Sequence, residues 1–226
     1  GLNMRENAKN FTIKDLPKIT KIAHSKNVKV YLTVNVICFD EEISEIKKIL
    51  LAAKKANIDA IISWDLGVIS LARENGLEIH LSTQSSVSNS LAIKEYSKLG
   101  IKRFVLAREC SLEQIKKIIK NTNSEIEIFI HGAMCVALSG RCFLSQFTYG
   151  DCTSANRGKC IQPCRREYLI TDIETGKQLE VHNNFILSPK DLCTLPFLEK
   201  ILALDVSALK IEGRGKSPEY VLIVTR

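Results

Sequence analysis

Cysteine is the residue type whose number and spacing in this sequence point most directly to chemistry. Six of the eight cysteines lie within residues 135–193, and five of them follow the spacing C-x₆-C-x₁₇-C-x₃-C-x₂₈-C: Cys135, Cys142, Cys160, Cys164 and Cys193. Thiolates are soft ligands that suit zinc or an iron–sulfur cluster. Only Cys160 and Cys164 have the close spacing of a zinc knuckle. The spacing leaves an iron–sulfur cluster, zinc, and buried or free thiols as alternatives.

Polar residues at the ends of expected strands are the next candidates for chemistry. His131 ends a strand beside Cys135 and is a candidate catalytic residue, with a hydrogen-bonded core histidine as the alternative. Glu212 is a second catalytic candidate, unless it only forms a salt bridge with Lys210 or Arg214. Gln84 is a candidate for substrate contact, because strand ends meet over the mouth of a barrel.

Two arginines are candidate substrate-binding residues. Arg141 lies beside the cysteines, where a cation would also stabilise thiolates. Arg214 follows the last strand and could bind a phosphate or carboxylate through two hydrogen bonds. Both are equally compatible with solvated arginines on loops.

Hydrolase motifs are missing from the sequence, which contains neither H-E-x-x-H nor G-x-S-x-G. A cysteine protease that uses Cys135 and His131 is conceivable, but no asparagine or aspartate is evident to orient the histidine. The clustered cysteines are also more than a single nucleophile requires.

The elements that must position these residues alternate between strand and helix with a period near 25 residues, which indicates a parallel sheet. The expected strands are 28–35, 59–63, 78–83, 102–106, 125–130 and 208–211. The expected helices are 13–26, 41–56, 66–75, 88–99 and 111–120, with an incomplete helical pattern after Pro218.

The fold that we expect is a TIM-type (β/α)₈ barrel, as one α/β domain over residues 1–226. Six strands and a first helix without a preceding strand suggest a fragment that lacks the first two strands; an open α/β sheet, complete as written, is the alternative. Residues 133–193 interrupt the alternation of strands and helices, and we expect them to form a Cys-rich insertion after the seventh barrel strand. Within it, 168–172 and 179–181 flank a turn and predict a β-hairpin.

Composition narrows the function only slightly. The chain has 226 residues, 45% of them hydrophobic, and a formal charge of +7. No apolar run is long enough for a membrane span and no secretory leader opens the sequence, so we expect a cytoplasmic protein with reduced thiols and no membrane contact. The basic charge weakly favours RNA as a partner; nothing in the sequence indicates DNA.

The segment from Glu127 to Ser145, EIFIHGAMCVALSGRCFLS, resembles the signature of the collagenase-like peptidase family, the peptidases of unknown catalytic type. NRGKCIQPCRR (156–166), KIEGR (210–214) and the opening GLNMRENAKNF are also similar to that family, so the resemblance covers essentially the whole chain. The opening is similar to the segment just after the second barrel strand of the family.

The resemblance implies two different activities. Some members are called collagenases or proteases, and others are hydroxylation factors for ubiquinone, tRNA or rRNA that hold an iron–sulfur cluster through four cysteines. Carried over by motif, the ligands of a [4Fe–4S] cluster would be Cys135, Cys142, Cys160 and Cys193, with Cys164 as a fifth candidate.

The leading hypothesis is therefore an iron–sulfur enzyme that hydroxylates RNA or a quinone precursor. The alternatives are a peptidase and a non-catalytic, cluster-bearing subunit of a heteromer. Because family members often act in pairs, a homologous partner subunit is also expected.

Overall fold

The computed structural model describes residues 2–180, 183–213 and 215–226. Within them, strands and helices alternate as the sequence predicts. The helices are α1 (Leu16–His24), α2 (Ile43–Lys55), α3 (Leu66–Glu74), α4 (Ser90–Ser97), α5 (Leu112–Lys120), α6 (Leu144–Tyr149), α7 (Leu198–Leu202) and α8 (Pro218–Thr225). The strands are β1 (Tyr31–Thr33), β2 (Ala60–Ser63), β3 (Ile79–Leu81), β4 (Arg103–Val105), β5 (Glu125–Gly132), β6 (Ile170–Thr171), β7 (Gln178–Leu179), β8 (Leu192–Cys193) and β9 (Ala208–Ile211).

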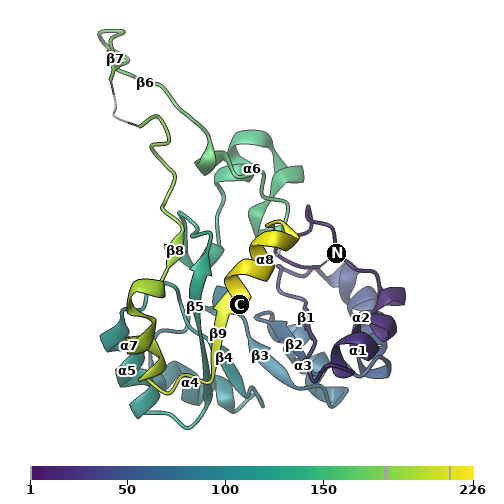
Figure 1. Ribbon diagram of the computed structural model, residues 1–226. Helices are drawn as coiled ribbons and strands as arrows, with labels where there is room; N and C mark the ends of the chain where they lie inside the picture. Colours follow the sequence, from purple (N-terminus) through teal and green to yellow (C-terminus); the bar gives the residue numbers. More distant parts are fainter. Residues whose placement is uncertain (1, 181–182, 214) are drawn as a thin grey trace.

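Six strands form a parallel sheet in the order β1-β2-β3-β4-β5-β9, and β8 pairs antiparallel with β5. Each of the six expected strands is present, although β1 is shorter than the predicted range 28–35. β6 and β7 pair antiparallel in an arm that projects from the body of the molecule (Figure 1). The arm itself contains no cysteine; the thiols lie before and after it.

The sheet is strongly curled. Arg103 Nη1 on β4 lies 3.4 Å from Tyr31 Oη on β1, although two strands separate them. Three inter-strand spacings in a flat sheet would hold these backbones roughly 14 Å apart, side by side. The two side chains meet because they project from the concave face of a half-barrel. Helices lie along its convex face, at the left and at the right of the view in Figure 1.

Local sequence signals explain the helices. Asp65 accepts a hydrogen bond from Val68 N at the start of α3, and Ser111 forms a capping box with Gln114 at the start of α5. On α2 the buried residues are Ile46, Leu50 and Ala53, which lie on one helical face against the sheet. The apolar core therefore lies between the helices and the convex face. Among the described residues, no helix has the length and apolar character needed to cross a bilayer.

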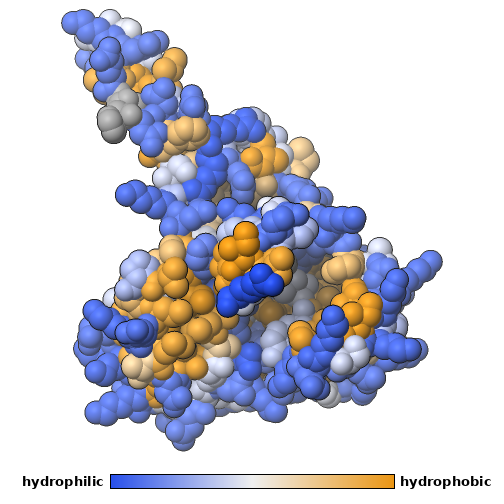
Figure 2. Space-filling model, viewed as in Figure 1, coloured by the Kyte–Doolittle hydropathy of each residue, from blue (hydrophilic) through white to orange (hydrophobic). Residues whose placement is uncertain are grey.

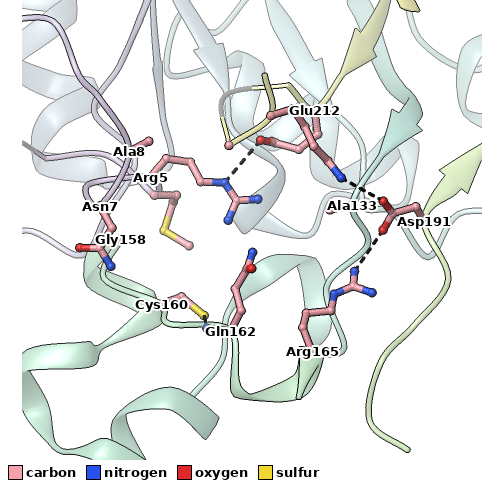
Figure 3. A pocket seen from close by; sticks show the side chains of 13 residues that line it. Arg5, Asn7, Ala8, Ala133, Gly158, Cys160, Gln162, Arg165, Asp191 and Glu212 are labelled. Atoms are coloured by element: carbon pink, nitrogen blue, oxygen red, sulfur yellow. Dashed lines mark hydrogen bonds and ion pairs between the residues drawn. The ribbon is translucent and has the colours of Figure 1, made fainter. Parts of the chain in front are cut away.

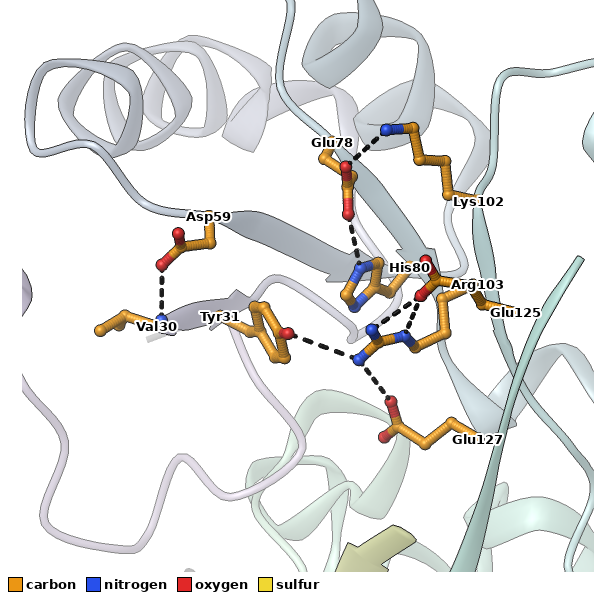
Figure 4. Close-up of polar contacts among 9 residues, drawn as sticks. All are labelled: Val30, Tyr31, Asp59, Glu78, His80, Lys102, Arg103, Glu125 and Glu127. Carbon is orange, nitrogen blue, oxygen red and sulfur yellow. Dashed lines mark hydrogen bonds and ion pairs between the residues drawn. The ribbon is translucent and has the colours of Figure 1, made fainter. Parts of the chain in front are cut away.

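The concave face carries charge instead (Figure 4). The buried Glu127 carboxylate forms ion pairs with Lys210 at 2.5 Å and with Arg103 at 3.6 Å. His80 is fully buried and contacts Glu78 at 3.1 Å; burial lowers the pKa of its imidazole, so the ring is neutral near pH 7. Charges in such a place are tolerated only when they are paired.

The Glu127 carboxylate should therefore matter more for stability than its exposed neighbour on the same strand. We expect Glu127→Ala to lower the free energy of unfolding by about 3 kcal/mol, because it leaves the partly buried Lys210 without its carboxylate and Arg103 with Glu125 alone. Glu125 also pairs with Arg103 but its side chain is 46% exposed, so Glu125→Ala should cost less than about 1 kcal/mol. Urea unfolding measures both, and equal losses would contradict the prediction.

Candidate functional site

A cavity of about 360 Å³ lies where the parallel strands end. Its wall is built from residues at or just after these ends, including Asn35 after β1, Gln84 after β3, Arg108 after β4 and Glu212 after β9. Residues at the carboxyl ends of curled parallel strands converge, and this is the usual place for a site in such folds. The remaining wall comes from the irregular segment that follows β5.

Four thiols line this cavity: Cys135, Cys142, Cys160 and Cys164. Three of them share one local geometry, in which the sulfur accepts a backbone N–H from the residue two positions later. The donor–sulfur distances are 3.5 Å for Ala137 N to Cys135, 3.3 Å for Leu144 N to Cys142 and 3.3 Å for Gln162 N to Cys160. N–H groups directed at sulfur favour the thiolate and tune the potential of a cluster.

Cys193 lies apart from this group. It sits on β8 opposite His131 of β5, is exposed, and does not line the cavity. The structure thus brings together three of the four ligands predicted by motif, together with the fifth candidate, Cys164.

The donor set fits a soft metal group. Burial raises the pKa of the Cys160 and Cys164 thiols, so a cation in the cavity would displace protons from them. In the described ranges, no three His, Cys, Asp or Glu side chains are already gathered in ligating geometry. Four thiols around one cavity nevertheless supply the sulfur ligands that an iron–sulfur cluster or a structural zinc takes.

Hydrogen bonds to the half-barrel hold the cysteine-bearing segment in place. Asn156 is buried; its side chain accepts from Cys142 N at 3.1 Å and its carbonyl accepts from Ile37 N at 3.2 Å. The Glu109 carboxylate accepts from the backbone N–H of Ser139 at 2.9 Å. The thiols are therefore positioned by contacts that reach to the ends of the strands, not by an α-helix or strand of their own.

Two glycines in the motifs permit close approach of the backbone. Gly158 has φ +79°, and a Cβ there would lie 2.0 Å from the carbonyl oxygen of Asn3. Gly132 has φ +115°, and its Cβ would lie 2.6 Å from the carbonyl oxygen of Glu212. Any side chain at either position would displace the neighbouring backbone. These glycines therefore allow the N-terminal segment and the residue after β9 to lie against the site.

Charged groups surround the thiols. Arg5 Nε forms an ion pair with Glu212 at 3.4 Å, and both residues also line a neighbouring cavity of about 380 Å³ (Figure 3). Arg108 stacks over Phe129 at 4.0 Å, and its buried Nε has no hydrogen-bond partner in the described structure. Burial lowers the pKa of this guanidinium, while Glu212 and Cys135 counter that shift. The cavity therefore has cationic walls beside its thiols.

The other residues predicted from sequence divide into two groups. Gln84 is buried in the cavity wall, where its side-chain oxygen accepts from Ser82 and Asn35. Glu212 also lines the cavity. His131 does not; its Nδ1 lies 2.6 Å from Tyr220 Oη of α8.

Arg141 also lies outside the cavity, where it donates to Ser86 Oγ at 3.1 Å. Arg214 falls outside the described residues.

Sequence reasoning missed Arg5 and Arg108. Arg108 follows the strand at 102–106 by two residues, so the same strand-end rule that selected Gln84 could have selected it. Arg5 stands in a segment without helical or strand periodicity, and no local signal marks it.

Comparison with known proteins places this chain in a family. The chain is 44% identical over its whole length to a protein named collagenase from Porphyromonas gingivalis, of which it covers 57%. It is 37% identical to the tRNA hydroxylation protein P1 of Bacillus subtilis, covering 98% of this chain and 53% of that protein. It is 36% identical to the 23S rRNA 5-hydroxycytidine C2501 synthase of Escherichia coli, covering 100% of this chain and 34% of that protein.

The chain thus spans about half the length of the curated relatives that it matches. Among solved structures, the U32 peptidase Mk0906 has a similar fold, with a TM-score of 0.55 at 13% identity, covering 96% of this chain and 83% of that one. The model of peptidase family U32 matches residues 1–226, and the chain therefore belongs to that family.

Proposed function

We propose that this chain is the cluster-bearing part of an iron–sulfur protein that hydroxylates RNA. The observation that carries the proposal is the gathering of four thiols around one cavity, three of them in the same N–H···S turn. The names of the relatives from Bacillus subtilis and Escherichia coli give the reaction and the substrate class. A bound [4Fe–4S] cluster would supply electron transfer or activation of the oxygen donor.

The chain's own residues have separate roles in this proposal. Cys135, Cys142 and Cys160 hold the cluster, and either Cys164 or Cys193 completes the set. The cationic guanidinium of Arg108 stabilises thiolate charge beside Cys135. The side-chain oxygen of Gln84 already accepts hydrogen bonds from Ser82 and Asn35, so its NH₂ group is the part that serves the cavity.

The arrangement supports a hydroxylase better than a peptidase. Among the described residues, no histidine lines the cavity with the thiols, and His131 is hydrogen-bonded to Tyr220 instead. A thiol protease needs a base beside its nucleophile. For the fold, we propose that the half-barrel is part of a complete (β/α)₈ barrel, since β1 and β9 each lack a partner on one side within the described residues.

Metal content tests the cluster. Anaerobically purified chain is expected to carry about four irons and four sulfides, with a broad visible absorbance band. Cys142→Ser should reduce both to background, because it removes a cavity thiolate. Cys152→Ser is the matched control, since Cys152 lies in the same segment but is exposed and outside the cavity. Full iron in Cys142→Ser, or zinc in place of iron in the parent chain, would contradict the proposal.

A pair of variants identifies the fourth ligand. A [4Fe–4S] cluster takes four thiolates, so we expect either Cys164→Ser or Cys193→Ser, but not both, to release iron as completely as Cys142→Ser. Cys164 lines the cavity, whereas Cys193 has the position that the family motif assigns. Retention of the cluster by both variants, or its loss from both, would argue against a site built from the three shared thiols and one more.

The reaction itself is tested in the organism that carries the gene. Replacing the chromosomal copy by the Cys142→Ser version should abolish a hydroxylated pyrimidine in total RNA, measured by nucleoside mass spectrometry. The Cys152→Ser version should leave it in place. An unchanged nucleoside profile in cells with Cys142→Ser would show that RNA is not the substrate.

A further inference from the structure

The helix beside the cysteine cavity exposes aromatic side chains to solvent. Phe143 is 70% exposed, Phe147 is 91% exposed and Tyr149 is 41% exposed. With Arg166, these residues are called the aromatic rim below. Figure 2 shows apolar side chains at the surface over α6, bordered by hydrophilic residues. Rings of this size are normally buried, and a group of them at the surface indicates a binding site.

Helix geometry places the rings together. Phe147 N donates to Phe143 O at 2.8 Å, so the two phenylalanines lie one turn apart on the same face. The guanidinium of Arg166 lies 4.9 Å from the centre of the Tyr149 ring and donates to Tyr149 Oη at 2.5 Å. The rim thus combines two flat apolar faces with a positive charge held at a fixed place.

The rim is also next to the proposed site. Phe143 directly follows Cys142, and Leu144 and Ser145 line the thiol cavity. Arg166 follows Cys164 by two residues. A linear polymer bound along the rim would therefore have its neighbouring monomer within reach of the cavity.

We propose that the aromatic rim binds a single-stranded stretch of RNA, with bases stacked on Phe143 and Phe147 and a phosphate at Arg166. Aromatic faces that stack on bases, combined with cationic groups that contact phosphates, are how proteins bind unpaired strands. Charge supports this occupant, since residues 141–167 contain five Lys or Arg and only two Asp or Glu. The inference rests on the proposed function and names the surface that would present RNA to its site.

Binding of a fluorescein-labelled RNA stem–loop with a single-stranded loop, followed by fluorescence anisotropy, tests the rim. Phe147→Ala should weaken binding about tenfold, because it removes one stacking face. Phe147→Trp should restore the affinity. The control is Ile173→Ala, which removes an apolar side chain that is 97% exposed on the projecting arm and should leave binding unchanged.

Salt dependence tests the charge. Arg166→Gln should reduce the slope of log Kd against log salt concentration by about 0.7, the value of one phosphate contact on a single strand. Lys177→Gln, on the exposed turn of the arm, should leave the slope unchanged. A purely structural role of Arg166 would alter the affinity without altering the slope.

Iron measured on the same samples separates this proposal from the previous one. Loss of RNA binding in Phe147→Ala with full iron supports RNA binding by the rim. Specific RNA binding by a parent chain that holds no iron would support the rim and contradict the cluster proposal. Equal RNA affinity of the parent chain and Phe147→Ala would overturn the rim, as would a parent chain that binds no RNA. A dimer that dissociates on Phe147→Ala in light scattering, without RNA binding, would assign the rim to self-association.

Discussion

Tyr31 and Arg103 stand on strands that are separated by two others, and their side chains meet because the parallel sheet curls. The candidate site depends on that curl. In a flat sheet the ends of β1 and β9 would lie at opposite edges, and residues that follow them could not share one wall. In the half-barrel, Asn35 and Glu212 line the same cavity. On the concave face, Glu127 of β5 pairs with Lys210 and Arg103 of its two neighbouring strands, so this face carries paired charges.

The thiols are placed by a second layer of contacts. Between β5 and β8, the described residues contain one short α-helix, α6, and the path of this segment is set by hydrogen bonds to Asn156 and Glu109 and by the ion pair of Arg165 with Asp191. The N-terminal segment closes over it at Gly158, where there is no room for a side chain. Backbone N–H groups then point at three sulfurs in turn. A cavity with sulfur ligands and cationic walls suits a group that carries negative charge, as a thiolate-ligated cluster does.

Membership of peptidase family U32 does not by itself decide between cleavage and hydroxylation, since the names of the relatives include both. The chemistry of the cavity separates the two possibilities. Proteolysis needs an activated nucleophile with a base, and the histidine closest to the thiols in sequence is turned toward α8. Gathered thiols suit the metal group that we propose, and an exposed aromatic helix beside them suits an unpaired nucleic-acid strand.

The sequence by itself determined the order of strands and helices, because periodicity, caps and glycine stops act within a few residues. It also marked Gln84 and Glu212, because the end of a strand can be recognised locally. Only the tertiary structure decided which of these residues share a cavity. It placed Cys164 with the other thiols and Cys193 outside them, turned His131 toward Tyr220, and brought Arg5 and Arg108 into the wall. These placements arise from contacts between segments as far apart as Arg5 and Glu212, which close only when the sheet curls, and apart from the strand-end position of Arg108 no local pattern encodes them.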